Sequence, residues 1–234
     1  MDLSIVLPVF NERLNIEILL KRISSLNKEG LNLEFIFVDG SSTDGSQNLI
    51  LDASANDKRI KLLESKKKLG YGFDLLRGLN ESKGEFVAWT HADLQTDLED
   101  VFRCFVKIKN KNDTKYLVKG FRKKRRLSEK IFSKLMEYYV FLKMGEKFTE
   151  INAQPKLFHR KFIHHLTKPQ SPNDFSFDLF ALIQAKKAGY KIIEIPVYFN
   201  DRIYGQAKGG GSLRTKLQLI RRTIKYINHL DGLI

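Results

Sequence analysis

The sequence predicts an α/β protein with a mostly parallel central sheet flanked by helices. Short apolar runs alternate along the chain with segments in which apolar residues recur at helical spacing. Polar and acidic residues directly follow several of these runs, which is where parallel strands of α/β folds carry their ligand sites. The 234 residues include 42% hydrophobic ones, enough to bury a substantial core. We expect one domain over residues 1–211, followed by a C-terminal amphipathic helix over 212–234.

The first half of the chain predicts strands that alternate with helices. Pro8 interrupts the first strand where it gives way to a loop, and Asn11 and Glu12 open the helix after it. A strand, a helix and a strand at this spacing make a βαβ unit, which predicts parallel pairing and a right-handed crossover. The expected strands cover residues 3–10, 34–38 and 60–63, and the expected helices run through residues 11–26, 49–53 and 75–79.

The stretch over residues 85–97 is the most informative one. A short apolar run preceded by a glycine turn predicts a buried strand, and this strand ends in a cluster of oxygen and nitrogen ligands. Asp93 and Gln95 offer oxygen ligands to a hard divalent cation and leave positions for phosphate and water, so one interpretation is a metal–diphosphate site. The alternative is that Asp93 and Asp97 only cap the next helix, expected over residues 98–108.

The second half of the chain is distinguished by a dense basic run over residues 119–126, after a strand at 116–118. Ser128 is the expected N-cap of the next helix, which is rich in apolar and aromatic residues. The run is either a solvated loop that leads into a core helix or a basic rim beside an apolar helix that touches a lipid surface. The expected elements after it are a loop and short strand over 151–160, a helix through 179–185 and a strand over 191–199.

The last predicted helix carries apolar residues on one stripe from residue 213 to 227, with arginines and lysines beside or opposite the stripe. Ser212 is its expected cap, after a flexible break at the three glycines 209–211. Such a helix either packs on its own domain or attaches to a membrane surface.

Composition limits the partners and the compartment. The formal net charge of +14 indicates an anionic partner, such as nucleic acid, anionic lipid or a nucleoside diphosphate. Nucleic acid is the least favoured, because the chain lacks a helix-turn-helix, a zinc pattern and an RNA-binding sheet signature. Cys104 is the only cysteine, which favours a reducing compartment and an inert core position. With no signal peptide and no run of about 18 apolar residues, we expect a cytoplasmic protein, soluble or peripheral on the cytosolic face of a membrane.

Five blocks of the sequence belong together by their order. They are IVLPVFNE at 5–12, VDGSSTDGS at 38–46, ADLQ at 92–95, GYKIIEIPV at 189–197 and RIYGQAK at 202–208. In this order they resemble the family-2 glycosyltransferases with a GT-A fold, most closely the polyprenyl-phosphate enzymes related to dolichol-phosphate mannosyltransferase. One such block alone is weak evidence for the family, but five blocks in the same order favour the metal–diphosphate interpretation of Asp93 over helix capping.

The resemblance implies a nucleotide-sugar site. Asp93 and Gln95 match the positions that hold Mg²⁺ or Mn²⁺ against the diphosphate, where the ion neutralises charge on the leaving group. Arg122, Arg202 and Lys208 match basic residues that bind phosphate through charge-assisted hydrogen bonds. The positions that match the nucleotide-binding loops of the family are Pro8, Phe10, Asn11, Glu12, Asp39, His91 and Ala92.

The implied reaction is an inverting hexosyl transfer from a GDP- or UDP-linked sugar, with Asp93, Asp178 and Arg202 as the catalytic candidates. A polyprenyl or dolichyl phosphate acceptor is already ionised and needs no general base. A glycan hydroxyl of the cell envelope, the alternative acceptor, needs a carboxylate to take its proton, and Asp178 is the candidate. The other interpretation of Asp178 is a favourable charge at a helix N-terminus.

The sequence departs from the family pattern at several site positions. His91 stands where the family usually carries an acid, and Gly40 replaces the second acid of the usual pair that begins with Asp39. Ala207 replaces a serine, and residues 152–155 differ from the family motif. These changes leave open a third interpretation, a relative without catalytic activity. The sugar, the base and the oligomeric state are not determined by the sequence.

Overall fold

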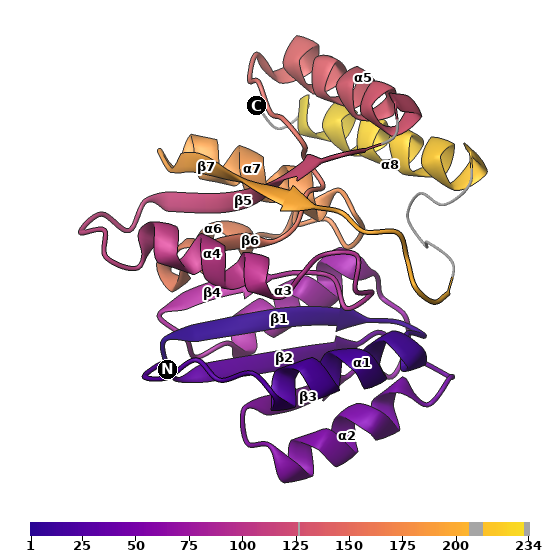
Figure 1. Cartoon of the computed structure of the whole chain (residues 1–234). Coiled ribbons are helices and arrows are strands. Elements are labelled where there is room, and N and C mark those ends of the chain that lie inside the picture. Colours follow the sequence, from indigo (N-terminus) through magenta and orange to yellow (C-terminus); the bar gives the residue numbers. More distant parts are fainter. Residues whose placement is uncertain (126, 206–212, 232–234) are drawn as a thin grey trace.

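The computed structural model describes residues 1–125, 127–205 and 213–231. Its centre is a seven-stranded sheet with the order β3-β2-β1-β4-β6-β5-β7 (Figure 1). Four strand pairings are parallel, and only β6 runs antiparallel to its two neighbours, so a mostly parallel sheet is confirmed. The strands are β1 (Leu3–Val9), β2 (Leu33–Asp39), β3 (Ile60–Glu64), β4 (Phe86–Trp89), β5 (Tyr116–Lys123), β6 (Lys156–His159) and β7 (Lys191–Tyr198).

Helices cover both faces of the sheet. Figure 1 shows α1, α2 and α4 on the side nearer the viewer, while α3, α6 and α7 lie behind. This three-layer arrangement is the one that alternating strands and helices predict. The helices are α1 (Arg13–Ser24), α2 (Ser46–Asn56), α3 (Tyr71–Glu81), α4 (Glu99–Ile108), α5 (Leu127–Met144), α6 (Ile163–Leu166), α7 (Phe177–Lys187) and α8 (Leu213–Asp231), with a 3₁₀ turn η1 (Arg160–Phe162) before α6.

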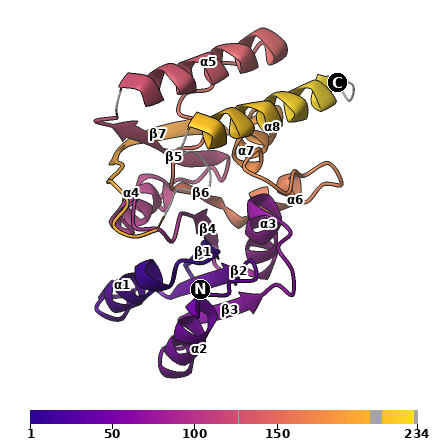
Figure 2. The ribbon, with the colours of Figure 1, turned by 90° about the vertical axis from the view of Figure 1, so that its right-hand side faces the viewer.

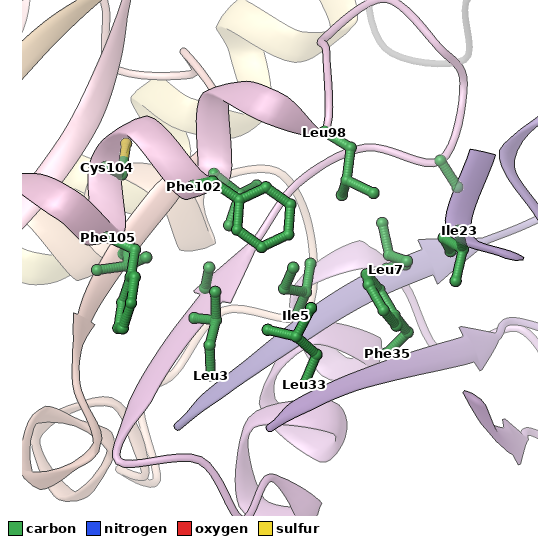
Figure 3. Close-up of a cluster of buried hydrophobic side chains, with 14 of the residues drawn as sticks. Leu3, Ile5, Leu7, Ile23, Leu33, Phe35, Leu98, Phe102, Cys104 and Phe105 are labelled. Atoms are coloured by element: carbon green, nitrogen blue, oxygen red, sulfur yellow. The ribbon is translucent and has the colours of Figure 1, made fainter. Parts of the chain in front are cut away.

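The strands feed two cores because successive side chains point to opposite faces. In β1, Leu3, Ile5 and Leu7 pack with Phe35 on the side of α1 and α4, whereas Val6 packs on the side of α3. Figure 3 shows the first of these cores, in which Leu98, Phe102 and Phe105 cover the strands. Cys104 lies in this core, where burial raises the pKa of its thiol, as expected for an inert cysteine.

Parallel pairing brings the loops after β1, β2 and β4 to one edge of the sheet. Val9 and Asp39, the last residues of β1 and β2, are paired in register, and Trp89 at the end of β4 pairs with Val6. Ligand sites of open parallel sheets form at this edge, outside the carboxyl ends of the strands.

Most of the described part of the basic run is not a solvated loop, although Lys123 and Lys124 are exposed, and this corrects one of the two sequence-based interpretations. β5 continues through Lys123, five residues beyond the predicted strand. Lys119 is buried and pairs with Glu194, while Arg122 and Arg125 are mostly covered and share Glu150. The acids that neutralise these cations come from distant segments, so the local sequence gives no sign of them. Ser128 lies in the first turn of α5 rather than at its N-cap.

α5 and α8 lie next to one another beyond β5 and β7, at the opposite end of the sheet from β3 (Figure 2). The Tyr139 hydroxyl donates to Asn228 Oδ1 at 2.8 Å, and Ile227 is buried with Val140. The predicted cap Ser212, the glycine break at 209–211 and Arg126 lie outside the described residues. Within the part of the chain that the structure describes, no helix is both long and apolar enough to cross a bilayer.

Candidate active site

A cleft of about 560 Å³ opens at the edge where β1, β2 and β4 end, and it extends under α5 and α8. One end is formed by Pro8, Phe10 and Gly40 from the loops after β1 and β2. The middle carries Asp93 and Arg202, and the far end is lined by residues of β5, α5 and α8. A cleft of this size accommodates a small-molecule ligand of several rings.

The loops after β1 and β2 are tied into one unit. The backbone N–H of Asn11 donates to Ser42 Oγ at 2.8 Å, and Asn11 Oδ1 in turn accepts from the backbone of Thr43 at 2.8 Å. The Glu12 N–H donates to Ser46 Oγ at 3.1 Å. Asn11 has a φ of 51°, a left-handed conformation that asparagine tolerates better than most residues. Its role here is to shape the loop, because it does not line the cleft.

Asp39 is fully buried at the end of β2. Its Oδ2 accepts from the backbone N–H of Ser42 at 2.8 Å and from Gln47 Nε2 at 2.6 Å. Its Oδ1 is buried and has no hydrogen-bond partner among the described residues. A buried acceptor without a donor is costly, and such an atom commonly marks a ligand position.

Arg202 joins two of the predicted carboxylates. Its Nη2 lies 2.5 Å from Glu12 Oε1 and 3.2 Å from Asp93 Oδ2, so one guanidinium bridges the loops after β1, β4 and β7. The second oxygen of Glu12 accepts from Asn15 Nδ2 at 2.6 Å. This bridge brings together residues that are up to 190 positions apart in the sequence.

The loop after β4 is held against the segment after β7. The N–H of Asn200 donates to the Gln95 carbonyl at 2.9 Å, and Gln95 Nε2 donates to the Asn200 carbonyl at 3.2 Å. These two bonds set the position of Arg202 relative to Asp93. The helix-capping interpretation applies only to Asp97, which accepts from the Glu99 N–H at 2.9 Å.

The donor set around Asp93 fits a cation that arrives with a diphosphate. Asp93 supplies one carboxylate and Gln95 one amide, while His91 stands in place of a further acid. The described residues contain no cluster of three or more His, Cys, Asp or Glu side chains arranged to hold a metal. Mg²⁺ is commonly bound by one or two carboxylates together with substrate phosphates and water, which is the arrangement these residues allow.

Asp178 sits at the start of α7 and is almost completely buried. Its Oδ1 accepts from Lys156 Nζ at 2.5 Å, Gln154 Nε2 at 2.9 Å and Trp89 Nε1 at 3.3 Å, and its Oδ2 accepts from the Tyr71 hydroxyl at 3.3 Å. Burial lowers the pKa of Lys156 to about 8, and the attraction of Asp178 opposes that shift. These partners favour a structural role, and the catalytic role of Asp178 stays a prediction.

A second group of cations lines the far end of the cleft. Arg122 Nε and Arg125 Nη1 lie 2.5 and 2.7 Å from the two oxygens of Glu150. Burial would raise the pKa of Glu150, but the two guanidiniums lower it below its usual value. Arg125 Nε is buried and lacks a hydrogen-bond partner in the described part of the chain. The pair offers a cationic surface to an anionic ligand group.

The structure gathers most of the predicted site residues and adds several. Asp39 and Asn11 stand behind the cleft wall, and Lys208 lies outside the described residues. Arg125 and Asp74 are additions that the sequence analysis did not single out, because Arg125 is one of several cations in a basic run and Asp74 belongs to a helical pattern. Lys156 and Tyr71, which contact Asp178, also have no local sequence signal. The predicted residues that line the cleft are Pro8, Phe10, Glu12, His91, Ala92, Asp93, Gln95, Arg122, Asp178 and Arg202.

The chain belongs to glycosyl transferase family 2, whose pattern it matches over residues 4–167. It is also 27% identical over 243 aligned positions to a dolichol-phosphate mannosyltransferase from Pyrococcus furiosus, an alignment that covers 100% of this chain and 67% of the relative. The family membership agrees with the resemblance that the sequence blocks indicate.

The fold is similar to solved structures of glucosyl-3-phosphoglycerate synthase from Mycobacterium tuberculosis. The complex with phosphoglyceric acid superposes with a TM-score of 0.77 at 18% identity, covering 99% of this chain and 80% of that one. The complex with Mn²⁺, UDP and glucosyl-3-phosphoglycerate gives a TM-score of 0.75 at 19% identity, with the same coverage. At this level of identity the likeness shows the GT-A fold alone.

Proposed function

We propose that this glycosyltransferase moves a hexose, with inversion, from a nucleoside-diphosphate sugar to a polyprenyl phosphate. The observation that carries the proposal is the bridge from Arg202 to Glu12 and Asp93, which gathers charged groups from three loops in the middle of one cleft. The nucleoside lies toward Phe10 and Gly40 in this scheme, and the diphosphate lies at Arg202. Charge-assisted hydrogen bonds from a guanidinium bind phosphate oxygens well.

Divalent metal belongs to the proposal. Asp93 and Gln95 would hold Mg²⁺ or Mn²⁺, and the ion would neutralise charge on the departing nucleoside diphosphate. Support comes from the fold relatives described above, whose structures contain Mn²⁺ with UDP-glucose and Mg²⁺ with UDP. Arg202, which contacts Asp93 at 3.2 Å, would bind phosphate oxygens of the leaving group through charge-assisted hydrogen bonds.

Two observations support a polyprenyl phosphate as the proposed acceptor of the sugar. The similarity to a dolichol-phosphate mannosyltransferase extends along the whole chain. In addition, Asp178 is the predicted base for a hydroxyl acceptor, yet its carboxylate is already engaged by Lys156, Gln154 and Trp89. An acceptor phosphate needs no base, and Arg122 and Arg125 offer it cations at the far end of the cleft.

A lipid acceptor requires access to a membrane, and α5 carries a surface suited to it. Five apolar residues, each between 52% and 74% exposed, follow one another at spacings of three or four and so share one side of the helix. Exposed Lys130 and Lys134 lie along one edge of this apolar stripe. We propose that this apolar stripe docks on an anionic bilayer from the cytoplasmic side. The stripe consists of Leu127, Ile131, Leu135, Tyr138 and Leu142.

The test is a transfer assay with radiolabelled GDP- and UDP-sugars, Mn²⁺ and polyprenyl phosphate in detergent micelles. We expect transfer to the lipid, loss of transfer in Asp93→Ala, and retention in Asp97→Ala, because Asp97 only caps α4. Transfer to a glycan hydroxyl but not to the lipid phosphate would replace the acceptor proposed here. An absence of thermal stabilisation by any nucleoside diphosphate with Mn²⁺, together with no transfer, would leave a non-catalytic relative.

A further inference from the structure

Asp74, in the first turn of α3, brings a carboxylate to the nucleoside end of the cleft. It is 5% exposed and lines the cleft, whereas Asp39 behind it is fully covered. Among the described residues, the one hydrogen bond that reaches the Asp74 carboxylate is a long one, 3.5 Å from Ser65 Oγ. A buried carboxylate with so weak a hydrogen bond gains free energy when a ligand donates a hydrogen bond to it.

The Asp74 carboxylate occupies the space that a side chain at position 40 would fill. A Cβ atom built on Gly40 would lie 2.8 Å from Asp74 Oδ2. The backbone of Gly40 lies outside the left-handed region, so the glycine is not required by its own conformation. The acid absent from position 40, next to Asp39, is thus supplied from α3.

The charge of Asp39 acts on the Asp74 carboxylate. Burial raises the pKa of Asp74 to about 6, and the negative charge of Asp39 adds to that rise while Ser65, Arg77 and Lys68 oppose it. Asp39 Oδ1 also lacks a donor in the described residues, but it lies behind the cleft wall, so Asp74 is the carboxylate that a base in the cleft can reach. A base edge with two adjacent donors can occupy both oxygens of one carboxylate, and guanine has this edge in N1–H and the 2-amino group. Uracil offers one N–H flanked by two carbonyl oxygens, so it gives the Asp74 carboxylate one donor and brings a carbonyl oxygen against the other carboxylate oxygen.

We propose that Asp74 recognises the nucleobase and selects a guanosine diphosphate donor over a uridine diphosphate donor. The inference rests on the proposed function, because it assigns the base end of the same nucleotide site. Asp74 would contact the base, and Asp39 behind it would hold the loop after β2 through Ser42 and Gln47.

The test measures binding of GDP, IDP and UDP to the full chain with Mn²⁺ by isothermal titration. IDP keeps guanine N1–H and lacks the 2-amino group, so it probes the second donor alone. We expect the order GDP, then IDP, then UDP, and in Asp74→Ala a loss of GDP affinity of about 10- to 100-fold with a change for UDP below about threefold. The double variant Gly40→Asp/Asp74→Ala, which moves the carboxylate back to position 40, should restore the preference for GDP.

Asp100→Asn is the matched control, since Asp100 is also a 5% exposed carboxylate whose pKa burial raises, but it lies on α4 and pairs with Arg103. It should leave all three affinities unchanged. Equal binding of GDP and UDP by the unmodified protein, or an equal loss of both in Asp74→Ala, would overturn the inference and leave the transferase proposal standing. If none of the three diphosphates binds, the proposed function and the inference fail together.

Discussion

Asp74 destabilises the folded protein at neutral pH because its carboxylate ionises inside the cleft wall. Its pKa of about 6 in the fold lies above the value of 3.8 for the free side chain. The folded state therefore binds this proton more tightly than the unfolded state, and stability is lost as the pH rises from about 4 to above 6. Functional sites commonly carry such a cost.

The first prediction concerns this pH dependence. Asp74→Asn removes the titrating group, so its free energy of unfolding should exceed that of the unmodified protein by about 1–3 kcal/mol at pH 7.5 and by little at pH 4. The groups that face Asp74 are Asp39, Ser65, Lys68 and Arg77, and all of them remain in the variant. Denaturant unfolding across this pH range measures the difference, and parallel profiles for the two proteins would contradict it.

The second prediction separates a structural from a catalytic Asp178. Asp178→Ala leaves the ammonium of Lys156 buried without its carboxylate, so unfolding should become easier by about 3–5 kcal/mol. Asp178→Ala/Lys156→Met removes both charges and should regain most of that loss. Urea unfolding of the three proteins is the measurement. A single variant as stable as the unmodified protein yet unable to transfer sugar would instead support Asp178 as a general base.

At the scale of elements, the two ends of the sheet contribute different parts of the cleft. The βαβ half, from β1 to β4, carries the end of the cleft where we propose that the nucleoside binds, and its loops are fixed by backbone and side-chain hydrogen bonds. The β5–β7 half carries Arg122, Arg125 and the segment with Arg202. Beyond it, α5 presents an apolar stripe outward while Val140 on its other side is buried in the core.

The third prediction tests the stripe as a membrane contact. Leu135→Glu places a negative charge at the middle of the stripe, so co-sedimentation with vesicles that contain anionic lipid should weaken by about tenfold or more, because apolar burial is lost and repulsion is added. Val106→Glu, which changes an equally exposed apolar residue on α4, is the matched control and should bind like the unmodified protein. Equal binding by both variants, or no vesicle binding at all, would rule the stripe out.

At the scale of the whole molecule, the net charge of +14 is distributed rather than gathered on one recognition element. Lys119 and Lys156 are buried and paired with acids, and Arg122 and Arg125, which share Glu150, face the cleft rather than an exposed surface for a nucleic acid backbone. The charge that remains on the surface would attract the anionic bilayer that we propose as the docking surface.

The fourth prediction follows from this distribution. Binding to duplex DNA should be weak at low salt and disappear near physiological ionic strength, because a non-specific electrostatic interaction falls steeply with salt. Stabilisation by a nucleoside diphosphate with Mn²⁺ should persist at the same salt. Fluorescence anisotropy and thermal unfolding measure the two effects. Tight DNA binding without any nucleotide stabilisation would point to the nucleic-acid module that the sequence disfavoured.

The sequence by itself determined the α/β class, the strands from β1 to β4 and the cluster of Asp93 with Gln95, because apolar periodicity and polar residues at strand ends are local signals. Through the family resemblance it also predicted that Asp39, Asp93 and Arg202 share one cleft; Asp93 and Arg202 line the cleft, whereas Asp39 is buried behind its wall. Only the tertiary structure decided which charges are paired. Lys156 pairs with Asp178, Arg125 pairs with Glu150, and Asp74 fills the space beside Gly40, and each of these contacts joins segments that are far apart in the chain. Burial and pairing depend on such distant partners, and no local pattern in the sequence encodes them.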